Sequence, residues 1–123
     1  MSHVEMIVKT HFHAAHRLPN YRGVCQRLHG HTYKVEARLS GNVDEETGML
    51  IDFTLVKKVL RKYDHENINH PDDVGLPSME NPTAENLARM FASDLLNLSD
   101  RIREVKITLW ETDDCAIHAE AFK

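Results

Sequence analysis

The sequence contains no apolar run that approaches the roughly 20 residues needed to span a bilayer. Its first residues also lack the basic segment and long apolar core of an export signal. Acidic and basic residues are interspersed and the formal net charge is -4, so no basic stripe marks a nucleic-acid or anionic-membrane surface. We therefore expect a cytoplasmic protein that binds neither membrane nor nucleic acid.

Cysteine is scarce, with Cys25 and Cys115 alone, and without an export signal we expect both to be free thiols in a reducing compartment. The sequence also lacks internal repeats, low-complexity tracts and a phosphate-binding glycine loop. A chain of 123 residues with 41% hydrophobic residues can bury one core of ordinary size, so a single domain over residues 1–123 is expected.

Hydrophobic periodicity predicts elements in the order β-β-α-α-β-β. Apolar and polar residues alternate over residues 4–13, 32–40, 105–111 and 116–122, whereas residues 51–63 and 83–98 show helical spacing. Asp52 or Thr54 can cap the first helix and Thr83 the second. This order indicates an α+β fold, an antiparallel sheet with two helices on one face. Because its two edges would be unpaired, a homo-oligomer that extends the sheet is expected.

Histidine is abundant, with nine residues, and two of them form a His-x-His pair where the second strand begins. Alternate strand residues share a face, so His29 and His31 can converge on one ion. An antiparallel first strand would bring His16 beside them, and three imidazoles with an open fourth position are typical of catalytic zinc. The alternative is that these are surface histidines. His11 and His13 form a similar pair, for which exposed strand positions are the favoured interpretation over metal ligation.

Cys25 lies four residues before His29 and has three possible roles. It could be a zinc ligand, although closed structural sites usually draw on two or more cysteines. It could be a small buried residue. A thiol near a dication and an imidazole has its thiolate favoured, which suits proton abstraction or nucleophilic attack, and we favour this catalytic role.

Three further polar residues could contribute to the site. Asp64 and His65 could form a proton relay to Cys25, or His65 could be a histidine that the dipole of the first helix favours at its end. Glu111, at the end of a strand, could accept two parallel N–H bonds from a planar ligand or could be an exposed charge.

Six motifs in order along the chain resemble the 6-pyruvoyl tetrahydropterin synthase family, most closely its bacterial 6-carboxytetrahydropterin synthase branch of queuosine biosynthesis. They are FHAAHRL (12–18), CQRLHGH (25–31), GMLIDF (48–53), DHENIN (64–69), ENPTAENLA (80–88) and WET (110–112). The three residues between Cys25 and His29 resemble the queuosine branch, and Cys25 itself argues against a folate branch that has glutamate in this role.

The resemblance implies a T-fold (tunnelling fold), whose protomers join edge to edge into a barrel and stack as two trimers into a hexamer, with sites between subunits. It implies that His16, His29 and His31 bind zinc, that Cys25 is the proton acceptor and that His65 with Asp64 forms the relay. By the same resemblance Glu111 anchors the pterin, and Thr83 contacts it from a neighbouring subunit. The implied substrate is 7,8-dihydroneopterin triphosphate.

Three other functions remain open at this point. The biopterin branch of the family makes a 6-pyruvoyl product with much the same groups. A zinc-stabilised pterin-binding protein would keep the histidines and Glu111 without turnover. A zinc hydrolase would use the open metal position to activate water and would not need Cys25.

Overall fold

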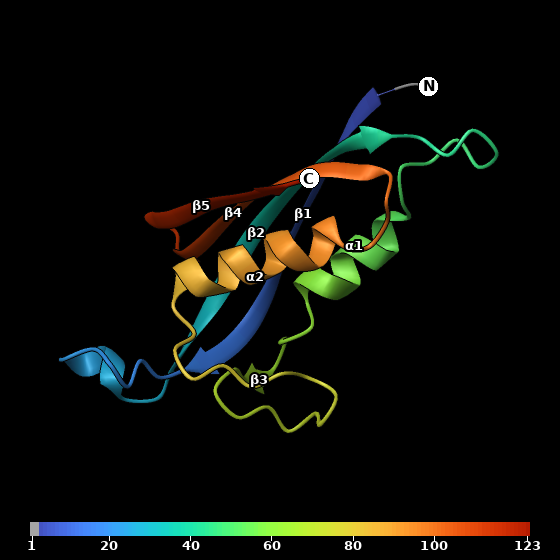
Figure 1. The fold of residues 1–123 in the computed structure, drawn as a ribbon. Coiled ribbons are helices and arrows are strands. Elements are labelled where there is room, and N and C mark those ends of the chain that lie inside the picture. The colour runs from blue at the N-terminus through green and yellow to red at the C-terminus, as the bar shows by residue number, and fades with distance from the viewer. Residues whose placement is uncertain (1–2) are drawn as a thin grey trace.

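The computed structural model describes residues 3–123, and a five-stranded sheet forms its centre (Figure 1). The strand order is β3-β1-β2-β4-β5, and all neighbours are antiparallel except β3, which runs parallel to β1. The strands are β1 (His3–His16), β2 (His29–Asn42), β3 (Glu66–Asn67), β4 (Ile102–Thr112) and β5 (Cys115–Phe122). The helices are α1 (Phe53–Leu60), α2 (Ala84–Leu96) and the short 3-10 helix η1 (Val24–Gln26). The predicted α+β fold is confirmed.

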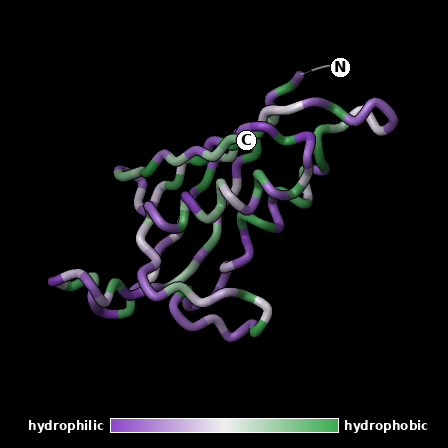
Figure 2. Tube along the Cα trace, in the orientation of Figure 1, coloured by the Kyte–Doolittle hydropathy of each residue, from purple (hydrophilic) through white to green (hydrophobic). Residues whose placement is uncertain are grey.

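One face of the sheet carries the core. Along β2, Tyr33, Val35, Ala37 and Leu39 are all buried, while the residues between them are exposed or half-buried. Figure 2 shows this alternation of apolar and polar residues along the strands. Because strand side chains point alternately to opposite faces, the period-2 pattern of the sequence is sufficient to define which face packs.

Both helices cover this apolar face (Figure 1), α1 against β1 and α2 against β4 and β5. The predicted helix caps form: the side chain of Asp52 accepts a hydrogen bond from the Thr54 N–H, and that of Thr83 accepts one from the Asn86 N–H. Each cap satisfies a backbone donor that has no partner within its helix. Within α2, Leu87, Phe91 and Leu95 are fully buried, as their helical spacing predicts.

The structure departs from the predicted elements between residues 61 and 82. The first helix ends at Leu60, because Arg61 leaves helical geometry, and not near Tyr63 as predicted. No regular element is predicted for residues 64–82, yet they contain the two-residue strand β3, which pairs with Ala14 and Ala15 of β1. A two-residue strand is too short to show periodicity in sequence. In residues 3–123, no helix is long and apolar enough to cross a membrane.

Candidate active site

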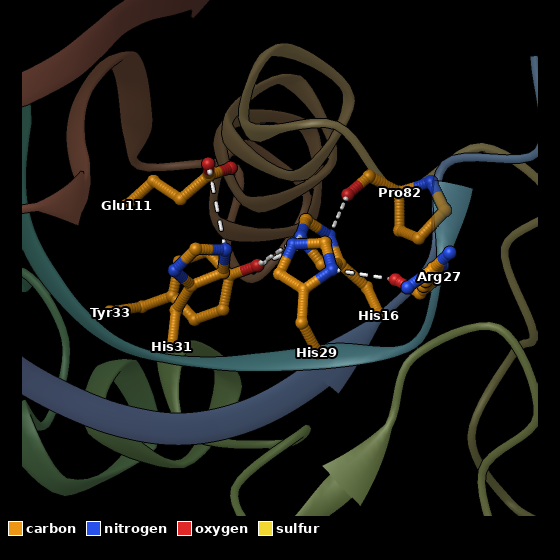
Figure 3. Close-up of polar contacts among 7 residues, drawn as sticks. All are labelled: His16, Arg27, His29, His31, Tyr33, Pro82 and Glu111. Atoms are coloured by element: carbon orange, nitrogen blue, oxygen red, sulfur yellow. Dashed lines mark hydrogen bonds and ion pairs between the residues drawn. The ribbon is translucent and has the colours of Figure 1, made fainter. Parts of the chain in front are cut away.

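Three imidazoles meet where β1 ends and β2 begins (Figure 3). His16 and His29 are directly paired across the two strands, and His31 lies two residues further along β2 on the same face. One ligand atom from each of the three lies within 4.8 Å of the others, and the Nε2 atoms of His16 and His29 are 3.1 Å apart. The convergence expected from the sequence is thus present, on the face of the sheet that carries the helices.

Backbone carbonyls fix two of the rings. Nδ1 of His16 lies 2.7 Å from the carbonyl oxygen of Pro82, and Nδ1 of His29 lies 2.7 Å from that of Arg27 (Figure 3). A carbonyl oxygen only accepts, so each hydrogen bond requires the ring proton on Nδ1. In the neutral rings the lone pairs are then on the two Nε2 atoms, which face each other. This is the tautomer and orientation that outer carbonyls impose on metal-binding histidines.

The arrangement of the cluster nitrogens suits a bound metal cation better than a hydrogen bond between the imidazoles. Two neutral Nε2 lone pairs cannot hydrogen-bond, whereas a cation between them satisfies both. Two nitrogens bound tetrahedrally at the usual zinc distance lie about 3.3 Å apart, close to the observed separation. Nε2 of His31 is also buried and has no hydrogen-bond partner in residues 3–123. The donor set therefore fits a three-histidine zinc site.

Burial favours the neutral form of two of the three imidazoles. It lowers the pKa of His16 and of His31, while the nearby Glu111 carboxylate partly offsets the effect in both. Tyr33 is fully buried, its hydroxyl lies 3.2 Å from Nδ1 of His16, and burial raises its pKa well above the ordinary value. His16 and His31 are thus biased toward the neutral form that metals bind.

Two residues that support the histidine cluster, Tyr33 and Asn69, are not predicted from the sequence. Tyr33 lies two residues after His31, and the strand period could have placed it beside the histidines. Asn69 is buried, donates from Nδ2 to the carbonyls of Arg17 and Glu80, and accepts from the Arg17 N–H. It thereby ties the chain after His16 to the segment that ends at Pro82. No local pattern predicts this contact, which joins residues 52 apart in the chain.

Glu111 is the nearest carboxylate to the cluster. Its Oε1 lies 3.6 Å from Nε2 of His31, and its side chain is 29% exposed. Together with Ala84 of α2 and Cys115 and Ile117 of β5, Glu111 lines a small hollow of about 190 Å³. The carboxylate is therefore accessible beside the histidines, where a planar N–H donor could reach it.

Cys25 does not join the histidine cluster. It lies in η1, within the loop that connects β1 to β2, and is half-buried. This loop projects beyond the end of the sheet in Figure 1, and the Leu18 N–H donates to the carbonyl of Cys25. The thiol is consequently carried by a loop attached directly to both ligand-bearing strands, and its catalytic role stays a prediction.

Asp64 and His65 lie at the sheet edge formed by β1 and β3, and neither belongs to the cluster. The His65 side chain is 79% exposed, and its ring is next to that of His13, with centroids 5.7 Å apart. Asp64 accepts hydrogen bonds from the His13 N–H and from Arg61. The His13 N–H is the largest cause of the lowered pKa of Asp64. Within one chain, the predicted relay and Cys25 are not gathered around the three histidines.

The remaining candidate site residues are Thr83, His11 and His13. The Thr83 hydroxyl caps α2, so its predicted contact with a pterin is not visible in one chain. His11 and His13 are exposed on the face of β1 opposite the cluster, and neither belongs to it. Their geometry agrees with the favoured interpretation of exposed strand positions.

Comparison with known proteins identifies the family. The sequence profile described as 6-pyruvoyl tetrahydropterin synthase matches residues 5–121. The chain belongs to this family. A 6-carboxy-5,6,7,8-tetrahydropterin synthase of Rickettsia conorii is 32% identical over 127 aligned positions, which cover 86% of this chain and 92% of that protein. The protein of the same name from Synechocystis is 37% identical over 93 positions, 68% of each chain.

A solved structure supports the same assignment of fold. The 6-pyruvoyl tetrahydropterin synthase of Caenorhabditis elegans superposes with a TM-score of 0.69 at 26% sequence identity, covering 98% of this chain and 97% of that one. The T-fold architecture of the single chain, expected from the six sequence motifs, is thus confirmed, as is the family membership, whereas the barrel and the hexamer stay predictions.

Proposed function

We propose that this chain is a zinc-dependent 6-carboxytetrahydropterin synthase of queuosine biosynthesis. It would convert 7,8-dihydroneopterin triphosphate and water to 6-carboxy-5,6,7,8-tetrahydropterin, acetaldehyde and triphosphate. The observation that carries the proposal is the convergence of His16, His29 and His31 on one point beside an accessible carboxylate. The names of the relatives in Rickettsia conorii and Synechocystis support the choice of product.

Each side chain would have a distinct task. Zinc, which the three imidazoles would hold, would supply a Lewis acid beside the bound substrate. Glu111 accepts hydrogen bonds from the amino group and ring N–H of the pterin, which orients the substrate beside the histidines. Cys25 accepts a proton from the substrate side chain, and His65 transfers protons as carbon–carbon cleavage and loss of triphosphate proceed.

An oligomer would complete the site. His65 lies at one end of the sheet order, beside β3, and β5 forms the opposite edge. Edge-to-edge pairing of protomers would cover the unpaired strands and could bring His65, Asp64 and Thr83 of one subunit to the histidine cluster of another. We propose a homohexamer, a dimer of trimers, as the active form.

Identification of the product tests this function. Zinc-loaded protein is incubated with 7,8-dihydroneopterin triphosphate, and the pterin is identified by mass while acetaldehyde is assayed separately. We expect 6-carboxytetrahydropterin and acetaldehyde in equal amounts, and neither from a metal-stripped sample. Restoration of both products by added zinc would link turnover to the metal.

A second candidate is a 6-pyruvoyl tetrahydropterin synthase, favoured by the likeness to the Caenorhabditis elegans structure. In the same assay it would give a pyruvoyl pterin and triphosphate without acetaldehyde. Substrate binding without any product would instead support a non-catalytic pterin-binding protein and would contradict the proposed enzyme.

A further inference from the structure

The turn that carries His65 is attached to β1 through side chains as well as backbone. His65 donates its N–H to the carbonyl oxygen of His13, and the His13 N–H donates in return to Oδ1 of Asp64, at 2.9 Å. Arg61 donates to the carbonyl oxygen of His11 and, at 2.8 Å, to Oδ2 of Asp64. One guanidinium therefore links the end of α1, the turn and the strand.

Arg61 and the strand occupy both oxygens of Asp64. Nε2 of His65 lies 3.8 Å from Oδ2 of Asp64, too far for a hydrogen bond, whereas the Arg61 nitrogen is within hydrogen-bond distance of the same oxygen. The Asp64 carboxylate thus holds the turn against β1 more directly than it holds the imidazole. The guanidinium and the His13 N–H together set the orientation of this carboxylate.

His65 itself has an unusual backbone conformation. Its φ of 62° makes it the one non-glycine residue with positive φ in residues 3–123. A residue with a Cβ adopts this left-handed region at a cost and keeps it only where neighbouring contacts hold the chain. The charged or titratable groups around the hollow that His65 lines are His13 and His31 of the sheet and Glu66 of β3. None of these hydrogen-bonds the His65 side chain in residues 3–123.

We propose that Arg61 is a positioning residue for proton transfer by His65. By fixing the Asp64 carboxylate and the adjoining β1 carbonyl, Arg61 holds the left-handed turn in the geometry that presents the His65 imidazole outward, toward a neighbouring subunit. The inference rests on the proposed function for its kinetic consequence. Its structural consequence, that Arg61 keeps the turn ordered, does not depend on that function.

Arg61→Met should lower kcat about ten- to a hundredfold, the scale expected when a catalytic group is misplaced by about 1 Å. KM and zinc content should stay close to those of the wild type, because other contacts, which do not involve Arg61, hold the histidine cluster in place. Arg61→Lys keeps the charge and can still reach one oxygen, so it should recover part of kcat. Arg38→Met is the matched control, since the Arg38 guanidinium likewise makes two hydrogen bonds, to the carboxylates of Glu5 and Glu36, and the variant should leave kcat unchanged.

Hydrogen–deuterium exchange tests the inference without turnover. The segment 61–68 should exchange faster in Arg61→Met than in wild type or Arg38→Met, with Arg61→Lys between them. If Arg61→Met has the same kcat and the same exchange rates as the wild type, the proposal is overturned. It is also overturned if the loss of kcat parallels a loss of zinc and Arg61→Lys does not relieve it. If wild-type protein forms no product, the proposed function fails, and the exchange rates alone decide the role of Arg61.

Discussion

Replacing His29 by alanine should abolish tight zinc binding and turnover together. The substitution removes one of the two Nε2 atoms that lie 3.1 Å apart in the cluster. Loss of a hydrogen-bond partner to a metal ligand already costs about 10–100-fold in affinity, so loss of the ligand itself should cost at least a hundredfold. Zinc content and a competition titration with a chelator measure the effect. Zinc should also raise the Tm of the wild type, by preferential binding to the folded state, and not that of the variant.

The matched control for this variant is His11→Ala. His11 is an exposed histidine of β1 on the face away from the cluster. It should retain zinc and its stabilisation, and each variant should keep the fold, because His29 is only half-buried. Equal zinc loss in both variants, or undiminished affinity in His29→Ala, would show that the metal is held elsewhere.

Cys25→Ala should retain zinc and lose turnover. Removal of a general acid or base lowers kcat by about 10²–10⁴-fold, and Cys25→Ser should be nearly as impaired, because a serine hydroxyl is a far weaker acid than a thiol. Steady-state kinetics on zinc-saturated proteins separate the two effects. The position of Cys25 in the loop next to the cluster, but outside it, is the basis of this expectation.

Two outcomes would revise the role of Cys25. Zinc loss in the alanine variant would make the thiol a ligand and the site a structural one. Retained turnover would favour the zinc hydrolase chemistry in which the metal alone activates the nucleophile.

Local periodicity accounts for the parts of this structure that the sequence predicts. The alternation along β2 places Tyr33 and the residues after it on the packed face, and the same period extended backward puts His29 and His31 there. The antiparallel register then brings His16 opposite His29. The histidine cluster could thus be anticipated from the sequence, because the two-residue period of the strands and the pairing of β1 with β2 determine it.

Contacts between distant segments account for what the sequence does not reveal. The Arg61–Asp64 pair is a local one three residues apart, whereas the His13 N–H that bonds Asp64 lies 51 residues away, and no pattern of residue types predicts this contact. The same holds for Asn69, which ties Arg17 to Glu80. A proton relay between Asp64 and the adjacent His65 is one interpretation of the sequence. In the structure, the hydrogen bonds of Asp64 instead hold the turn against β1.

X-ray absorption at the zinc edge tests the central claim most directly. The cluster predicts three nitrogen donors at about 2.0–2.1 Å, one further light atom and no sulfur in the zinc-loaded protein. That result would establish a three-histidine site with an exchangeable position, as catalysis requires. A sulfur scatterer at about 2.3 Å would place Cys25 or Cys115 on the metal and would contradict a three-histidine site with an exchangeable position.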